Sequence, residues 1–185
     1  MKSLICSDSH DQVSNFTMAL ELAVTAACDS VIFCGDLCSS FMLDVYHVKC
    51  PLPLHMIFGN NDGDKFHLLK KSEKLNMERD AWSRIRIHGE FIIAEKGHDL
   101  DGIPSDISLA VYHYPEMAKI IALSGKLQVV CCGHTHVSSI EKINDTLLIN
   151  PGSLMGYISG KKMEHVKPSC VIINWQTGEL ELIEL

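Results

Sequence analysis

The sequence predicts an α/β fold, and three observations support this prediction. Short apolar runs typical of buried strands alternate with stretches whose apolar residues recur at helical spacing. The chain has 185 residues and a hydrophobic composition of 46%, which is enough to build one sizeable core. Several apolar runs end in Asp, His or Asn, and ligands in α/β sheets gather at the carboxyl ends of strands. We therefore expect residues 1–185 to form a single domain.

The first half of the chain alternates between strands and helices. The predicted strands are residues 2–6, 30–34 and 54–58. The predicted helices are residues 13–27, 41–46 and 64–75. In the first helix, the apolar residues from Val13 to Ala27 recur at helical spacing and therefore share one face, which would pack on the sheet. Pro51 and Pro53 mark the loop into the third strand.

The second half of the chain is mostly β-structure. Apolar residues from Ile85 to Ile93 predict a hairpin, and residues 97–106 have the composition of a long loop. A helix begins at Pro115 and ends before Gly125, which is the preferred order of proline and glycine at helix ends. Residues 159–168 are expected to form another loop. The remaining predicted strands are residues 107–112, 128–132, 137–143, 146–149, 170–175 and 179–183.

The composition excludes several classes of protein. A net charge of −7 and a pI near 5.8 argue against a protein that binds nucleic acid or anionic membranes. No apolar run approaches the length of a membrane span, and the N-terminal apolar segment is too short for a signal peptide. Most of the eight cysteines lie in apolar strand-like runs, which predicts buried thiols in a reducing, cytoplasmic compartment. Trp82 and Trp175 are expected to be packing or partly exposed aromatic residues.

Five apolar runs end in side chains that can bind a metal ion. These side chains are Asp8, His10, Asp36, Asn60, His113, His134 and His136. Taken singly, each motif has an ordinary interpretation as a helix cap, a turn or a histidine satisfied by the fold. Together they offer oxygen and imidazole nitrogen without thiolate, which suits Mn, Fe or Zn and argues against a cysteine-type structural zinc site. The histidines without a ligand-like context are His47, His55, His67, His88, His98 and His165.

The order of these motifs, from Asp8 to Ser153, resembles that of the calcineurin-like metallophosphoesterases. The motifs read Asp-x-His, Gly-Asp, Gly-Asn-x-Asp, His and Gly-His-x-His. The short chain and the segment Asn150-Pro151-Gly152-Ser153 are similar to the small YfcE-type phosphodiesterase branch of that family. The resemblance implies a four-layer alpha/beta/beta/alpha sandwich of two mixed sheets, with the site at one edge of the sheets.

The same resemblance divides the metal ligands between two ions. The first ion would be held by Asp8, His10, Asp36 and His136. The second would be held by Asp36, as a bridge, with Asn60, His113 and His134. Two divalent ions are expected, Mn²⁺ first, with Zn, Fe, Ni or Mg as alternatives. Such a pair can clamp a phosphate and lower the pKa of a shared water, so that a metal-bridging hydroxide attacks the phosphorus. The expected catalytic residues are Asp36, Asn60 and His134.

The chain departs from the family pattern at Asn61. Many members carry histidine there, and asparagine cannot supply a proton at neutral pH. We therefore expect slow turnover that depends strongly on the acidity of the leaving group. The expected substrate contacts are Asn61, Asp62 and Ser153, with Asp62 mainly orienting its loop. The lysines at positions 65, 70, 71 and 74 form either a solvated helix face or a patch that steers an anionic substrate.

Three functions are compatible with this pattern. The first is a phosphodiesterase for small phosphorylated molecules, acting alone or as a homo-oligomer. The others are a phosphomonoesterase and a non-catalytic protein-interaction module, like the retromer subunit built on the same fold. All seven ligand positions are filled in this sequence, which favours an enzyme. A nuclease of the same superfamily would need a basic groove, which does not fit this acidic chain.

Overall fold

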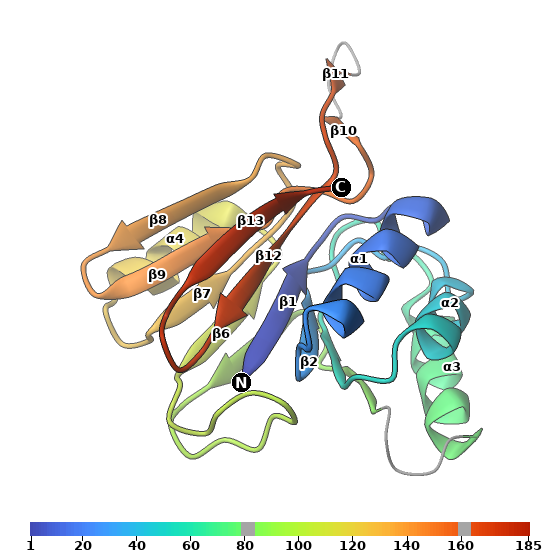
Figure 1. Ribbon diagram of the computed structural model, residues 1–185, viewed down its shortest axis with the longest axis horizontal. Helices are drawn as coiled ribbons and strands as arrows, with labels where there is room; N and C mark the ends of the chain where they lie inside the picture. Colours follow the sequence, from blue (N-terminus) through green and yellow to red (C-terminus); the bar gives the residue numbers. More distant parts are fainter. Residues whose placement is uncertain (79–83, 159–163) are drawn as a thin grey trace.

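A computed structural model describes residues 1–78, 84–158 and 164–185 of the protein. Two mixed β-sheets pack face to face, and helices cover the outer side of each sheet (Figure 1). The layers therefore run helix, sheet, sheet, helix. This arrangement confirms the predicted α/β class and the four-layer sandwich.

The six-stranded sheet has the order β13-β12-β1-β2-β3-β4. Its strands are β1 (Lys2–Cys6), β2 (Ser30–Phe33), β3 (Leu54–Met56), β4 (Ile85–Ile87), β12 (Ser169–Asn174) and β13 (Leu180–Glu184). The strands from β1 to β4 are parallel, while β12 and β13 run antiparallel to their neighbours. The carboxyl ends of β1, β2 and β3 therefore open at the same edge of the sheet.

The five-stranded sheet has the order β5-β6-β7-β9-β8. Its strands are β5 (Phe91–Ala94), β6 (Leu109–Tyr112), β7 (Val129–Cys131), β8 (Ser139–Ile143) and β9 (Thr146–Asn150). The central strands β6, β7 and β9 are parallel, and the edge strands β5 and β8 are antiparallel to them. A separate short pair, β10 (Tyr157–Ile158) with β11 (Glu164–His165), projects near the top of Figure 1.

Helices α1 (Val13–Thr25), α2 (Met42–Lys49) and α3 (Lys65–Glu78) cover the six-stranded sheet, and α4 (Pro115–Leu123) covers the other. The apolar stripe of α1 is buried, and Phe16 meets Phe33 of β2 edge-on with ring centroids 5.8 Å apart. Proline occupies the start of α4, and Gly125 follows its end with a φ of 64°, as predicted. Helices α2 and α3 both extend beyond their predicted ends.

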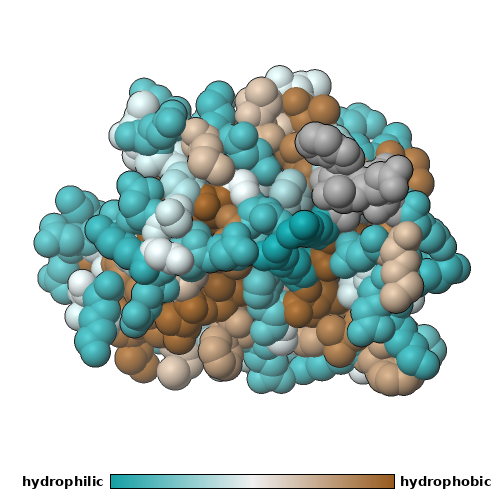
Figure 2. Space-filling view, turned by 90° about the horizontal axis from the view of Figure 1, so that it is seen from below, coloured by the Kyte–Doolittle hydropathy of each residue, from teal (hydrophilic) through white to brown (hydrophobic). Residues whose placement is uncertain are grey.

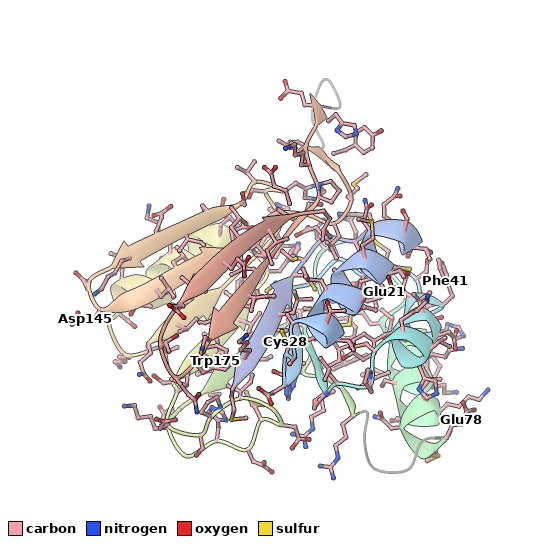
Figure 3. The ribbon with its side chains drawn as sticks, in the orientation of Figure 1. Glu21, Cys28, Phe41, Glu78, Asp145 and Trp175 are labelled. Atoms are coloured by element: carbon pink, nitrogen blue, oxygen red, sulfur yellow. The ribbon has the colours of Figure 1, made fainter. Side chains whose placement is uncertain are left out.

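The core between the sheets is built from alternate residues of their strands. In β1, Leu4 and Cys6 face the helices while Ile5 faces the second sheet, and all three are fully buried. Burial on both faces explains why this strand reads as a continuous apolar run. Trp175, labelled in Figure 3, is in the inter-sheet core, and its indole N–H donates to Ser3 Oγ at 2.7 Å. All eight cysteines are free thiols, as predicted.

One predicted element is wrong, and two predictions fall partly or wholly outside the described residues. The strands within residues 85–93 do not form a hairpin, because β4 pairs with β3 in one sheet and β5 pairs with β6 in the other. The turn at Gly89, with a φ of 84°, instead carries the chain from sheet to sheet. Of the expected loop at 159–168, residues 159–163 lie outside the described residues and 164–165 form β11. Trp82 also lies outside them.

The surface is consistent with burial of the apolar sheet faces inside the molecule. The face seen from below is covered largely by hydrophilic residues, interrupted by separate hydrophobic patches (Figure 2). Among the residues that the structure describes, no helix has the length and apolar character needed to cross a membrane.

Candidate metal centre

The strand ends that the sequence singled out meet at one edge of the two sheets. Asp8 follows β1, Asp36 follows β2 and Asn60 follows β3, while His113 follows β6 and His134 follows β7. Residues far apart in the chain are brought into contact there. The Nε2 atoms of His10 and His136 lie 3.1 Å apart although 126 positions separate these residues. The structure therefore gathers all seven predicted ligand residues into one site.

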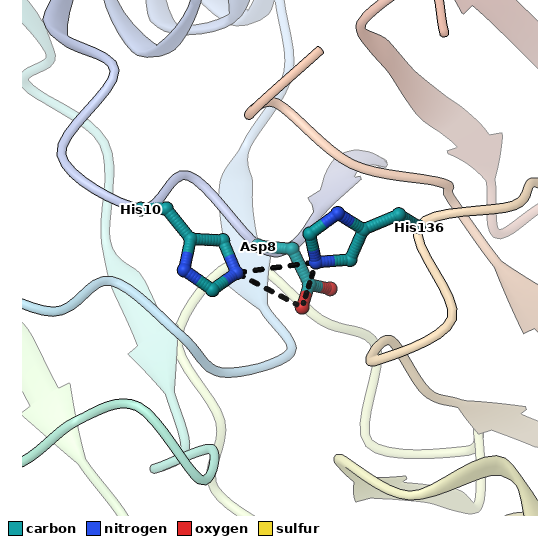
Figure 4. A group of neighbouring side chains, drawn as sticks. All are labelled: Asp8, His10 and His136. Carbon is teal, nitrogen blue, oxygen red and sulfur yellow. Dashed lines mark hydrogen bonds and ion pairs between the residues drawn. The ribbon is translucent and has the colours of Figure 1, made fainter. Parts of the chain in front are cut away.

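The first group of ligands is Asp8, His10 and His136 (Figure 4). Asp8 is fully buried, and its Oδ1 lies 3.3 Å from His136 Nε2 and 3.8 Å from His10 Nε2. Its other oxygen accepts the backbone N–H of His134 at 3.0 Å. Asp8 Oδ1 is buried and accepts no hydrogen bond, so it faces the two imidazoles without a fixed partner.

The second group is joined to the first by Asp36. Oδ2 of Asp36 lies 3.5 Å from His10 Nε2 and 3.4 Å from His113 Nε2. Beyond it, Oδ1 of Asn60 lies 3.1 Å from His113 Nε2 and 2.9 Å from His134 Nδ1. Asp36 thus stands between the two groups, which is the position expected of a bridging carboxylate. Asn60 and His134 are exposed, whereas His113 is buried.

Backbone carbonyls orient two of the imidazoles. His113 Nδ1 donates to the carbonyl oxygen of Cys34 at 2.8 Å, and His136 Nδ1 donates to the carbonyl oxygen of Tyr157. A carbonyl oxygen can only accept, so each Nδ1 carries the proton. In the neutral form of each ring, Nε2 therefore presents a lone pair toward the carboxylates, which is the tautomer that binds a metal ion.

The loops that carry the ligands have unusual backbone conformations. Positive φ angles occur at Asp8 (54°), His10 (41°), Asp36 (61°), His134 (71°) and His136 (61°). Such angles cost about 1–3 kcal/mol each and tend to cluster at functional sites. The loops also approach closely, since a Cβ added at Gly59 would lie 2.2 Å from Asp36 Oδ1 and one at Gly133 would lie 2.5 Å from Asp8 Oδ2. Glycine is needed at both positions for the ligands to meet.

The carboxylates and imidazoles of the site shift one another's pKa values. Burial would raise the pKa of Asp8, but contacts with His10 and His136 outweigh it and hold this pKa well below its usual range. The pKa of Asp36 is also lowered, because His113 and Asn61 outweigh its burial. Burial opposes protonation of His113, yet the contact with Asp36 and the nearby charge of Asp8 raise the pKa of this histidine. Two buried carboxylates thus remain ionised and attract positive charge.

These features fit divalent cations. A buried carboxylate oxygen lacks a hydrogen-bond partner, and two imidazoles are fixed with lone pairs directed at the carboxylates. The donor set is oxygen and nitrogen, which suits Mn, Fe or Zn. Among the described residues, two groups have donor atoms close enough to share an ion, and Asp8 belongs to both. One of these sets is Asp8, His10 and His136. The other is Asp8, Asp36 and His113.

The predicted substrate contacts are occupied by other interactions. Asp62 is 1% exposed, and its oxygens accept backbone N–H groups of Asp36, Cys38 and Gly59. Ser153 is also 1% exposed, and its hydroxyl donates to the carbonyl oxygen of Asp8 at 2.9 Å. Both side chains therefore fix the ligand loops, which for Asp62 agrees with its expected role in orienting its loop.

Asn61 differs from these two because it is exposed at the site. Its side-chain amide donates to Asp36 Oδ2 at 2.8 Å, and its backbone N–H donates to Asp36 Oδ1 at 2.7 Å. Asn61 therefore orients the central carboxylate from an exposed position.

A cavity of about 220 Å³ adjoins the second group of ligands. Asn60 and His113 form one wall of it. The other lining side chains are Phe58, Lys65, Glu90, Tyr112 and Tyr114. No sequence motif marks Glu90 or the two tyrosines, because they line the cavity only once the chain has folded. Lys65 was noted only as one member of a lysine-rich helix face.

Comparisons with known proteins agree with this geometry. Residues 1–178 match the family described as the calcineurin-like phosphoesterase superfamily domain. The chain is 31% identical over 160 residues to a phosphodiesterase of Methanocaldococcus jannaschii, a match that covers 86% of this chain and 88% of the relative. A solved structure of an archaeal phosphodiesterase has a TM-score of 0.81 and 29% identity, with 100% of both chains covered.

Proteins of another kind share the fold. Vps29 of Entamoeba histolytica, solved in complex with zinc, has a TM-score of 0.58 and 15% identity, with 100% of this chain and 98% of that chain covered. At this identity the likeness shows the fold alone. The family match extends over nearly the whole chain and includes every ligand residue of the site. The chain therefore belongs to the calcineurin-like phosphoesterase superfamily and is a metal-dependent phosphoesterase.

Proposed function

We propose that this protein is a phosphodiesterase that hydrolyses small phosphodiesters at a dinuclear metal centre, with Mn²⁺ as the first expected metal. The observation that carries the proposal is the position of Asp36, whose Oδ2 lies within 3.5 Å of His10 Nε2 and 3.4 Å of His113 Nε2. A carboxylate between two groups of oxygen and nitrogen donors is suited to hold two cations at once. We also propose that residues 1–185 act as one domain in a reducing, cytoplasmic setting, consistent with eight free cysteines.

The ligand residues divide between the two ions as the family resemblance implies. The first ion would be held by Asp8, His10, Asp36 and His136. The second would be held by Asp36, Asn60, His113 and His134. When bound, the ions supply positive charge to the phosphate and lower the pKa of a water molecule, which provides the nucleophile.

The chain's own residues would orient the reaction. The carbonyl groups of Cys34 and Tyr157 hold the rings of His113 and His136, so their Nε2 atoms do not turn away from the carboxylates. The amide of Asn61 fixes the rotation of Asp36. Because this amide cannot donate a proton to a departing alkoxide, good leaving groups such as nitrophenolate should react fastest.

A diester is favoured over a monoester by the relative from Methanocaldococcus jannaschii, which is a phosphodiesterase. The cavity beside Asn60 and His113 also gives an esterified group somewhere to bind. The alternative of a protein-interaction module draws on the Vps29 structures, but these are related to the chain by fold alone. The completeness of the ligand set favours the enzyme.

The proposal is tested by a screen of metal-loaded protein. Aryl and cyclic phosphodiesters would be compared with the matching monoesters in the presence of Mn²⁺, Zn²⁺, Ni²⁺ or Mg²⁺. We expect hydrolysis of bis(4-nitrophenyl) phosphate to exceed that of 4-nitrophenyl phosphate, and the variant Asp36→Asn to lose this activity. Lys74→Met is a matched control, because Lys74 pairs with Glu78 on the surface of α3. Full activity of Asp36→Asn, or a preference for the monoester, would overturn the proposal.

A further inference from the structure

We infer that the cavity beside Asn60 and His113 receives one ester arm of the substrate and selects a flat, uncharged arm that carries hydrogen-bond acceptors. This inference rests on the proposed phosphodiesterase function and adds the chemical class of the substrate arm. The cavity holds about 220 Å³ and shares Asn60 and His113 with the second group of metal ligands. A phosphate bound at those residues would therefore place an attached group at the mouth of the cavity.

Lys65 supplies the hydrogen-bond donor of this cavity. It is the first residue of α3, where a cation is unfavourable for the helix because the N-terminal end is already positive. Its position is therefore explained better by the cavity than by the stability of the helix. Lys65 Nζ donates to Glu90 Oε1 at 2.8 Å, and an ammonium group has three donors. Glu90 uses one of them, which leaves donors for an acceptor on the ligand.

The same lysine disfavours a cationic arm. The carboxylate of Glu90 and the ring of Phe58 are the groups that would otherwise attract an ammonium ion into this cavity. Lys65 already interacts with both, since its Nζ also lies 5.3 Å from the centroid of the Phe58 ring. A second cation would meet the charge of Lys65 without a free counterion. The cavity is therefore matched to neutral, acceptor-bearing groups.

Tyr114 supplies a flat wall of the cavity beside the ligands. It lies in the turn between β6 and α4 and is 38% exposed. Its ring centroid is 4.9 Å from that of His134, 5.3 Å from that of His113 and 6.1 Å from that of Tyr112. An aromatic arm can pack against these rings in an offset or edge-to-face arrangement, which adds binding energy beyond simple burial.

The other lysines of α3 have different surroundings, which separates Lys65 from the general charge of the helix. Lys71 pairs with Asp44 and Lys74 pairs with Glu78, while Lys70 lies over the ring of Phe66. Only Lys65 of these four lines the cavity. A substitution at Lys74 therefore removes the same charge from the same helix without touching the cavity, and it provides a matched control.

The test measures binding of three non-hydrolysable phosphonates to the Mn²⁺-loaded protein by calorimetry. The probes are 4-nitrobenzylphosphonate, benzylphosphonate and 2-aminoethylphosphonate, each of which has a single arm. We expect the wild type to bind them in that order, with the nitrobenzyl compound bound most tightly. Lys65→Met should remove the advantage of nitrobenzyl over benzyl, a loss of about tenfold in affinity for one hydrogen bond to a charged group. Tyr114→Leu should weaken both aromatic probes, and Lys74→Met should change none of them.

Rescue and activity measurements complete the test. Lys65→Arg should restore the preference for the nitrobenzyl probe, since it keeps a charged donor at the same position. Equal affinities for the three probes in the wild type, or an unchanged preference in Lys65→Met, would overturn the inference. Hydrolysis of bis(4-nitrophenyl) phosphate is followed in the same preparations. Absence of selectivity in the wild type with intact hydrolysis counts against the inference about the cavity alone, whereas absence of hydrolysis in the wild type counts against the proposed function.

Discussion

His113 and His136 lie against buried carboxylates, whereas His55 and His88 lie against each other. At the metal centre, Asp8 and Asp36 raise the pKa values of His113 and His136 in spite of burial. In the second pair, His55 Nδ1 lies 3.2 Å from His88 Nε2, and His55 Nε2 donates to the carbonyl oxygen of Asp101 at 2.9 Å. Here burial lowers both pKa values, that of His88 to about 4.

The difference teaches how one residue type serves two purposes. A histidine beside a buried carboxylate sits where positive charge is stabilised, so a cation can take the place of its proton. A buried histidine that contacts no carboxylate stays uncharged and links structural elements by hydrogen bonds. His55 and His88 join β3 to the end of β4 and to the loop containing Asp101. Both pairs are partly or fully buried, so it is the neighbouring charges that distinguish them.

The largest expected effect comes from the same substitution made in each pair. His136→Gln removes an imidazole from the first metal group, so we expect phosphodiesterase activity to fall by about 100-fold or more. His88→Gln removes an imidazole of the structural pair and should leave activity within about twofold of the wild type. Both are measured as kcat/KM on bis(4-nitrophenyl) phosphate with Mn²⁺. Similar losses in the two variants would mean that the two sets of histidines do not differ in function.

The next effect concerns the close approach of the ligand loops, which the pair of His55 and His88 does not require. A Cβ at Gly59 would lie 2.2 Å from Asp36 Oδ1, so Gly59→Ala should displace the Asp36 carboxylate and lower activity by about tenfold or more. Gly63→Ala is the control, because a Cβ there meets no atom within 4 Å. Equal activities of the two variants would show that the spacing at Asp36 is not critical.

A smaller effect is expected from placing a further histidine at the carboxylates. Asn61→His should raise activity on alkyl phosphodiesters by about tenfold relative to aryl ones, because an imidazole can donate a proton to a poor leaving group. The loss of the Asn61 hydrogen bond to Asp36 works in the opposite direction. The ratio of alkyl to aryl kcat values separates the two effects, since only proton donation depends on the leaving group. An unchanged or lower ratio would contradict the expected role of this position.

The smallest effect is on the free energy of unfolding and comes from the pair of His55 and His88. Burial, followed by the charges of His55 and Arg86, lowers the pKa of His88 from 6.5 to about 4. The unfolded chain binds this proton below pH 6.5 while the folded chain does not, so its contribution is complete above pH 6.5 and is lost as the pH falls toward 4. Allowing for partial exposure of His88, the free energy of unfolding should decrease by about 1 kcal/mol between pH 7 and 5.

This pH dependence is measured by urea denaturation of the wild type and of His88→Gln at both pH values. The variant should lose less stability than the wild type on acidification, because it lacks the titrating group. An equal decrease in the two proteins would show that His88 does not remain neutral in the folded state.

The residues alone were sufficient to predict the α/β class and the convergence of the ligand residues, while the four-layer arrangement came from the family resemblance. The reason is physical: parallel strands buried on both faces are visible as apolar runs, and their carboxyl ends must share an edge. Strand partners were harder, because Ile85 and Phe91 are close in the chain yet join different sheets. The hydrogen bonds of Asp62 to Asp36 and Cys38, and of Ser153 to Asp8, were also not foreseeable, since these partners lie on other loops.

The supporting groups around the ligands show the same limit. The carbonyl of Cys34 that holds His113 is 79 positions away, and every residue type offers a carbonyl. Glu90 reaches the cavity from the turn before β5 and Tyr114 from the turn after β6, so nothing in their local sequence marks them. The chemistry-bearing residue types are visible in a sequence, whereas the groups that position them depend on contacts made only in the fold.

The most direct test of the metal centre is the number of ions bound per chain, measured by elemental mass spectrometry after loading with Mn²⁺ and removal of free metal. The wild type and His88→Gln should each hold two ions per chain, as the division of ligands around Asp36 requires. Asp36→Asn should hold fewer, because the carboxylate shared by both groups is lost. A wild type that binds one ion or none, or an Asp36→Asn variant that still binds two, would contradict the account.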